Sequence, residues 1–253
     1  MAVIHIRATE ALLWRCLNKK QMAIKLFCLP YAGGSAAVFN KCREFTGSNI
    51  SLHPVEMSGR GTLMAQPPYA TVEAAVADVL MRIREELHNG PYALLGYSMG
   101  AVLAYELALK IKEQHLPAPV HLFFLGKGAP DVQLPVERTY HWLDDHSFKK
   151  MLLEMGGTPP EFFQYPELQE FFIPLLRNDF RLAETDFSLR KVTTHACDIS
   201  VLLGKDEKVS VESADAWKYH TTGACHVSYF EGGHFFLNNN VEKVMTLINR
   251  TLT

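Results

Sequence analysis

The stretch YALLGYSMGAVLAYELAL, from Tyr92 to Leu109, joins a strand pattern to a helix pattern. Its residues are apolar up to Gly96, as in a strand buried on both faces, and those after Gly100 have helical spacing. Ser98 stands between the two glycines at this junction. Glycines on both sides of a tight turn let the strand and the helix approach closely. The pattern therefore predicts a sharp strand-to-helix turn with the serine hydroxyl exposed at its tip.

The rest of the chain repeats this order of strand and helix. Apolar runs of strand type are KLFCLP, SLHPVEM, VHLFFLG, DISVLLG and HVSYFEG, and helical patterns lie between them over residues 71–87, over residues 101–113 and in VEKVMTLINRTL. Alternating strands and helices favour an α/β fold, with a mostly parallel central sheet flanked by helices.

One segment interrupts the alternation. Residues 131–190 contain no clear strand and are rich in bulky apolar side chains, and GGTPPE and YPEL divide them into several helices. We predict a helical lid subdomain over 131–190, inserted into a core formed by residues 24–130 and 191–253. Helices that simply pack into the core are the alternative.

Composition narrows the function. The 253 residues carry a net charge of −2, which gives no nucleic-acid footprint and no polybasic membrane patch. No window approaches the ~20 apolar residues of a membrane span. The five cysteines are scattered and form no CxxC pair, which favours reduced thiols and a cytoplasmic protein.

The N-terminal segment has the weakest signal. Charges interrupt the apolar stretch that a signal peptide needs, so we expect no secretion. Residues 1–23 are predicted to be a disordered tail, or a short amphipathic helix over 7–19, and a start at Met22 is an alternative.

The residues GYSMG match the GxSxG pattern of a nucleophile elbow. A serine hydroxyl is a weak nucleophile and needs a base, and in this arrangement the chain order is nucleophile, acid, histidine. His234 follows the last strand in a Gly-Gly-His turn, and Asp206 follows the preceding strand. We therefore predict Ser98, Asp206 and His234 as the catalytic residues, with Glu207 as the closest competitor for the acid.

An oxyanion hole needs two N–H donors. The N–H of Met99, directly after the nucleophile, is one candidate, and the loop CLPYAGGSAAVF after an early strand supplies Ala32 as the other. A plain turn or a phosphate loop is the alternative for Gly33-Gly34, although neither GxGxxG nor GxxxxGK[ST] is present. No HExxH or paired Cys/His spacing indicates a metal, so we expect no metal and no cofactor.

Several motifs together resemble one family. LPYAGGSA, SGRG, GYSMG, PLLRNDF, GKDEKVS, DAWKYHTTG and GGHFFL are similar to segments of the type II thioesterases of polyketide and non-ribosomal peptide synthesis, over residues 25–252. The resemblance implies an α/β-hydrolase fold with Ser98 as nucleophile, Asp206 as acid, His234 as base, and Ala32 and Met99 as oxyanion donors.

Two positions depart from the family pattern. Tyr97 stands where the family usually has histidine, and Ser58-Gly59-Arg60 stands where it usually has Pro-Gly-Arg. Neither change touches a predicted triad position, so both leave the preferred acyl group open.

The resemblance also implies a reaction. Such enzymes hydrolyse acyl or aminoacyl thioesters from the phosphopantetheine arm of acyl or peptidyl carrier proteins, and so remove stalled groups from an assembly line. We expect a monomer that meets these carriers transiently. The alternatives are a general carboxylesterase, a product-releasing thioesterase, and a carrier-binding protein without activity.

Overall fold

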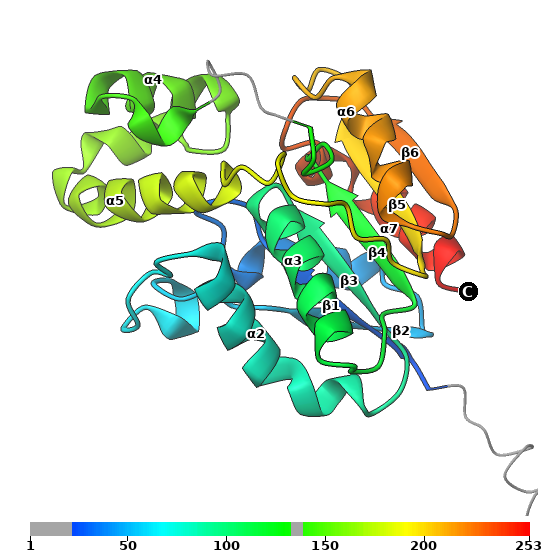
Figure 1. Cartoon of the computed structure of the whole chain (residues 1–253). Coiled ribbons are helices and arrows are strands. Elements are labelled where there is room, and N and C mark those ends of the chain that lie inside the picture. Colours follow the sequence, from blue (N-terminus) through cyan, green and yellow to red (C-terminus); the bar gives the residue numbers. More distant parts are fainter. Residues whose placement is uncertain (1–21, 133–138) are drawn as a thin grey trace, which may run out of the picture.

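The computed structural model describes residues 22–132 and 139–253. Its strands are β1 (Ile24–Leu29), β2 (Ile50–Pro54), β3 (Tyr92–Tyr97), β4 (His121–Leu125), β5 (Asp198–Gly204) and β6 (Cys225–Phe230). They form one sheet in the order β2-β1-β3-β4-β5-β6, with every neighbouring pair parallel (Figure 1). The predicted parallel sheet is confirmed. Its strand order reverses between β1 and β3, and ligand sites in open α/β sheets lie at the carboxyl ends of the strands at such a point.

Helices cover both faces of the sheet. The helices α2 (Val72–Leu87) and α3 (Met99–Glu113) pack on one face, and the 3₁₀ helix η1 (Ala36–Phe45) and α7 (Leu237–Thr251) pack on the other (Figure 1). Short helices η2 (Gly61–Leu63), α6 (Val211–Asp215) and η6 (Ala216–His220) lie in the connections. Successive strand residues alternate between the two apolar clusters, as a period of two requires. A core on each face therefore holds the carboxyl ends of the strands in place.

In the segment without a strand pattern, the described residues form helices. Beyond the undescribed residues 133–138 it contains η4 (Tyr140–Trp142), α4 (Asp145–Met155), η5 (Pro160–Gln164) and α5 (Pro166–Ala183). The motif GGTPPE follows α4, whose last turn is closed by Gly156 with a φ of 82°. Phe148, Met151, Leu152, Ile173 and Phe180 form a small apolar cluster between α4 and α5. These helices make a separate lobe beside the sheet (Figure 1).

Two predictions concern the ends and the environment of the chain. The tail predicted for residues 1–23 lies outside the described residues except for Met22 and Ala23. Among the helices of the described part, none combines the length and the apolar character that crossing a membrane requires.

Candidate active site

Ser98 occupies a strained turn between β3 and α3. Its φ of 55° and ψ of −109° lie outside the regions that a residue with a side chain normally adopts. The N–H of Ser98 donates to the carbonyl of Leu125 at the end of β4, at 2.7 Å. The strained residue is thus held by the neighbouring strand, as a nucleophile elbow requires.

Close packing explains the two glycines of the motif. A Cβ atom on Gly96 would lie 2.1 Å from the carbonyl oxygen of Gly100, and one on Gly100 would lie 2.1 Å from the carbonyl oxygen of Leu29. Both neighbours are main-chain atoms that cannot move aside. Any side chain at either position would therefore push α3 away from β3 or from the end of β1.

The two predicted oxyanion donors lie in neighbouring segments. Leu29 pairs with Gly96 in the sheet, so the loop that contains Ala32 runs beside the elbow. Met99 is the first residue of α3, and its N–H has no acceptor within the helix. The N–H of Ala32 makes no hydrogen bond to any described residue. Both N–H groups are therefore available to a ligand, and the positive end of the helix dipole favours negative charge beside Met99.

His234 has a carboxylate partner. It lies in the loop between β6 and α7, and its Nδ1 is 2.5 Å from Oε1 of Glu207, in the loop after β5. The Glu207 side chain is only 6% exposed and that of His234 is 21% exposed. The other oxygen of Glu207 accepts the N–H of Gly204 at 3.2 Å, which fixes the carboxylate. With Nδ1 occupied by Glu207, Nε2 is the nitrogen left for a reaction.

The structure differs from the sequence prediction at the acid. Asp206 makes no hydrogen bond or ion pair to His234, and its side chain is exposed. Its main-chain N–H instead donates to the carbonyl of Gly232 at 3.1 Å, which ties the loop after β5 to the loop of His234. This turn directs the side chain of Asp206 to solvent and that of Glu207 inward. The geometry therefore favours Glu207, the competitor, as the acid.

The third link of the predicted triad is not formed as a hydrogen bond. The hydroxyl of Ser98 bonds to no described residue, so its contact with His234 stays a prediction. Tyr97, however, donates its hydroxyl to the main-chain carbonyl of His234, and the two rings are 5.9 Å apart. Ser98 therefore directly follows a residue that touches His234.

Two residues that support this pair had no role assigned from the sequence. Burial raises the pKa of Tyr97, so its hydroxyl stays protonated and able to donate. Gly126, after β4, has a φ of 64°, and a Cβ atom there would lie 3.3 Å from both Glu207 Oε1 and His234 Cε1. The signal for Tyr97 was its departure from the family histidine, whereas Gly126 had no signal beyond being a glycine after a strand.

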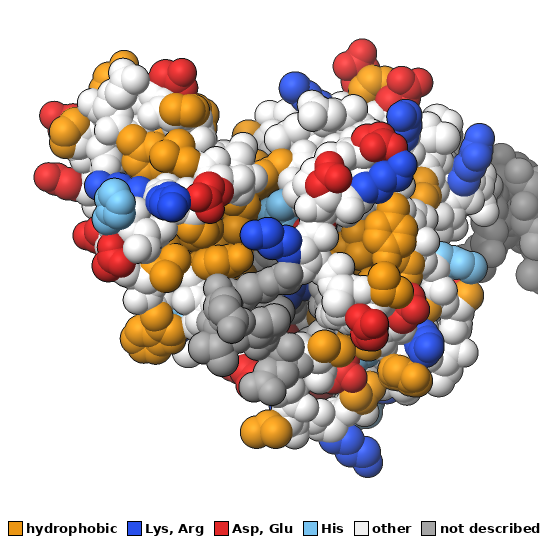
Figure 2. Space-filling view, turned by 90° about the horizontal axis from the view of Figure 1, so that it is seen from above, with side chains coloured by type: hydrophobic (Ala, Val, Ile, Leu, Met, Phe, Trp, Pro, Cys, Tyr) orange, Lys and Arg blue, Asp and Glu red, His pale blue; other side chains and the backbone are white. Residues whose placement is uncertain are grey.

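Aromatic side chains and the helical lobe border the site. Tyr31 packs edge-on against both Tyr97 and Phe235, with ring centroids 5.2 and 5.0 Å apart. A Cβ atom on Gly157, just after α4, would lie 2.1 Å from Phe235, so the lobe reaches the residue next to His234. Seen from above, the surface is hollowed between the lobe and the rest of the molecule, and hydrophobic side chains line much of this hollow (Figure 2). The surroundings suit an apolar substrate group.

Within residues 22–132 and 139–253, no group of three or more His, Cys, Asp or Glu side chains is arranged to hold a metal ion.

A serine in a strand-to-helix elbow and a histidine–carboxylate pair, on a parallel sheet flanked by helices, are the features of an α/β-hydrolase fold. The model of the Thioesterase domain family matches residues 24–252, so the chain belongs to the thioesterase family.

Known relatives agree with this assignment. The gramicidin S biosynthesis protein GrsT of Aneurinibacillus migulanus is 34% identical over 215 residues, which are 85% of this chain and 83% of that protein. The structure of ClbQ from the colibactin NRPS/PKS pathway has a TM-score of 0.83 and 36% identity, and the match covers 91% of this chain and 97% of ClbQ. YbtT, a type II thioesterase from the yersiniabactin NRPS/PKS pathway, has a TM-score of 0.80 and 28% identity, covering 91% and 93%. The resemblance to type II thioesterases is confirmed.

Proposed function

We propose that this protein hydrolyses acyl or aminoacyl thioesters on the phosphopantetheine arms of carrier proteins, through an acyl-enzyme intermediate on Ser98. The observation that carries the proposal is the pairing of His234 Nδ1 with Glu207, in a loop that Tyr97 ties to the elbow of Ser98. Glu207 replaces Asp206 as the acid.

In the first half of the reaction Ser98 Oγ attacks the thioester carbonyl. His234 Nε2 takes the hydroxyl proton, and Glu207 stabilises the imidazolium that forms. The carbonyl oxygen becomes an oxyanion between the N–H groups of Ala32 and Met99. When the C–S bond breaks, the thiolate leaves with the proton from His234, and the acyl group stays on Ser98.

In the second half a water molecule repeats these steps. His234 removes a proton from the water, which attacks the acyl-serine ester, and the same two N–H groups stabilise the second oxyanion. The C–O bond to Ser98 breaks, Oγ recovers its proton from His234, and the free acid leaves.

The substrate assignment has two supports. Relatives such as ClbQ and YbtT come from NRPS/PKS pathways, and the resemblance to type II thioesterases implies carrier proteins as partners. The lobe of α4 and α5 packs against Phe235 beside His234, so it is placed to act as a lid over the acyl group. A slender arm enters such a covered site more easily than a bulky free ester. We propose that the protein is a cytoplasmic monomer that meets its carrier transiently and removes stalled groups.

The nucleophile is tested by replacing Ser98 with alanine. Turnover of an acyl thioester falls by ~10⁴-fold or more, as for triad knockouts in comparable enzymes. Intact-mass measurement after a rapid quench detects an acyl adduct in the native protein and none in the variant. Ser48→Ala, at an exposed turn far along the chain from the elbow, serves as the control and keeps native turnover. Near-native hydrolysis by Ser98→Ala would remove Ser98 as the nucleophile.

The substrate class is tested by presenting one short acyl group in three ways: on a holo carrier protein, on N-acetylcysteamine, and as an aryl ester. We expect the highest kcat/KM for the carrier, because contacts to its surface add binding energy. Equal values for the carrier and the small thioester, or faster turnover of the aryl ester, favour a general esterase. Binding of the carrier without any turnover favours the inactive carrier-binding protein.

A further inference from the structure

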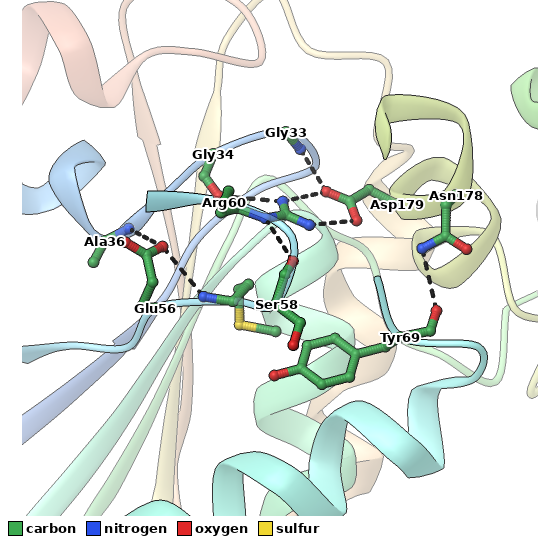
Figure 3. Close-up of polar contacts among 10 residues, drawn as sticks. Gly33, Gly34, Ala36, Glu56, Ser58, Arg60, Tyr69, Asn178 and Asp179 are labelled. Atoms are coloured by element: carbon green, nitrogen blue, oxygen red, sulfur yellow. Dashed lines mark hydrogen bonds and ion pairs between the residues drawn. The ribbon is translucent and has the colours of Figure 1, made fainter. Parts of the chain in front are cut away.

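A buried ion pair connects the lobe to the loop of Ala32. Arg60 lies in the loop after β2, Asp179 lies on α5, and their side chains are only 4% and 1% exposed. Arg60 Nη2 donates to Asp179 Oδ1 at 2.8 Å, and Nη1 contacts Oδ2, so the pair is bidentate. Figure 3 shows the guanidinium between Asp179 and the segment of Gly33 and Gly34. Three distant segments of the chain therefore meet at one pair of charges.

Both charges also bind main-chain atoms of the Ala32 loop. Asp179 Oδ2 accepts the N–H of Gly33 at 2.7 Å, and Arg60 Nη1 donates to the carbonyl of Gly34 at 3.3 Å (Figure 3). Arg60 Nε donates in addition to the carbonyl of Ser58 at 3.2 Å. The pair thus holds one N–H and one carbonyl on either side of the Gly33–Gly34 peptide.

The segment held in this way is a tight turn. The N–H of Gly34 donates to the carbonyl of Tyr31 at 2.9 Å, and Gly33 has a φ of 78°. A bond from the fourth residue back to the first, with a positive φ at the third, is the pattern of a type II turn. A Cβ atom on Gly33 would lie 2.4 Å from Leu176 of α5, so the lobe also packs on the turn.

The turn sets the direction of the Ala32 N–H. That N–H and the carbonyl of Tyr31 belong to one peptide group, and in a planar trans peptide they point in opposite directions. Because Gly34 holds the Tyr31 carbonyl, the Ala32 N–H must point away from the turn. It bonds to no described residue, whereas the N–H groups of Gly33 and Gly34 donate to Asp179 and to the Tyr31 carbonyl.

We propose that Arg60 and Asp179 are positioning residues for the oxyanion hole: they lock the turn of Tyr31 to Gly34 so that the Ala32 N–H is preorganised for the acyl oxygen. The inference rests on the function proposed above, since it assigns a role to that oxyanion. This role makes α5 part of the framework that positions the oxyanion hole, in addition to any role as a lid over the acyl group.

A role in stability alone accounts for this pair less well. Apolar side chains of similar volume often replace a buried ion pair without loss of stability, because desolvation offsets the attraction. What apolar side chains cannot supply is an acceptor for Gly33 and a donor for Gly34. The polar atoms of the pair bind the turn, so they fix its geometry as well as each other.

The test uses two variants and one control. Asp179→Asn removes the charge but leaves Arg60 buried and unpaired, which is strongly destabilising in comparable cases. The double variant Arg60→Met with Asp179→Leu removes both charges and keeps a buried apolar contact. Asp145→Asn is the matched control, because it breaks an exposed ion pair with Arg177 within the lobe, and Asp145 makes no recorded bond to the turn. Thermal unfolding and active-site titration count the folded, competent sites in each.

The readouts are kcat per titrated site, KM, and inhibition by a trifluoromethyl ketone analogue of the acyl thioester. The analogue forms a bond between Ser98 Oγ and its carbonyl carbon, the hydroxyl proton passes to His234, and the ketone oxygen becomes an oxyanion. Loss of one oxyanion donor costs ~10²–10³ in kcat in comparable enzymes. For the double variant we expect kcat to fall by roughly 10- to 10³-fold, with KM within about threefold and the inhibition constant raised in step with the loss of kcat. Asp145→Asn keeps native values.

A folded double variant with native kcat per titrated site and a native inhibition constant overturns the proposal. So does a variant that loses titratable sites while the remaining sites keep full kcat, because the pair then serves stability alone. Failure of the proposed function looks different, since the native protein itself then shows no thioester turnover that depends on Ser98.

Discussion

Two adjacent acids, Asp206 and Glu207, are candidates for the carboxylate that supports His234. The variant Glu207→Gln tests which of them has this role. Glutamine keeps the shape of the side chain and an oxygen for Nδ1, but it removes the negative charge 2.5 Å from the imidazole. The charge matters only when His234 becomes an imidazolium, so the variant acts on the transition state and leaves the ground state nearly unchanged.

The size of the effect follows from the geometry. Two unit charges whose centres lie ~4 Å apart attract by about 4 kcal/mol at the effective dielectric constant of ~20 that describes such sites. Each ~1.36 kcal/mol changes a rate tenfold, which corresponds to about 10³-fold. The imidazole is 21% exposed, and solvent screening reduces the attraction. We therefore expect kcat to fall by roughly 10²- to 10³-fold, with KM little changed.

The assay is steady-state hydrolysis of one acyl thioester by Glu207→Gln and by Asp206→Asn. The second variant is the matched control, because its side chain is exposed and has no bond to His234. We expect Asp206→Asn to stay within about threefold of the native kcat, since surface substitutions away from such contacts have small effects. A larger loss for Asp206→Asn than for Glu207→Gln would refute the reasoning and restore Asp206 as the acid.

Two further substitutions and one hydrogen-exchange measurement test the surroundings of the site. Tyr97→Phe removes the hydroxyl that binds the His234 carbonyl, and we expect the free energy of unfolding in urea to fall by about 1 kcal/mol and kcat to fall several-fold. A native kcat in the folded variant would show that the ring alone positions the loop. Gly126→Ala puts a methyl group 3.0 Å from Tyr97 at a φ of 64°, so it should lower both the melting temperature and kcat, and an unchanged kcat would mean that the histidine–glutamate pair tolerates displacement. Hydrogen exchange of main-chain amides should be faster in α4 than in β3 and β5. It should be slower around the buried Asp179 of α5 than in α4. Uniform protection would count against a lobe in which α4 moves more than α5.

The sequence by itself determined the features that depend on neighbouring residues. The order of strand and helix follows from apolar periodicity, which the local chain carries in full. The elbow is equally local, because Gly96, Ser98 and Gly100 lie within one turn, and the structure accounts for both glycines by main-chain contacts below 3 Å. The loop of Ala32 and the turn of His234 were found in the same way, from glycines that directly follow strands.

Only the tertiary structure shows which of Asp206 and Glu207 contacts His234. Both are acidic and adjacent, so composition and spacing cannot separate them. The choice depends on which way the loop after β5 turns, and that turn is set by hydrogen bonds to the loop after β6, including the bond from Asp206 N–H to Gly232.

The ion pair beneath α5 shows the same limit at longer range. Arg60 and Asp179 are 119 residues apart, and each lies in a motif, SGRG or PLLRNDF, that marks the family without revealing a contact. Their meeting at the turn of Gly33 requires β1, the loop after β2 and α5 to converge at the carboxyl edge of the sheet. A single sequence does not predict this meeting of segments, because long-range contacts arise from packing of the whole chain. They leave no periodic signal in the segments that make them.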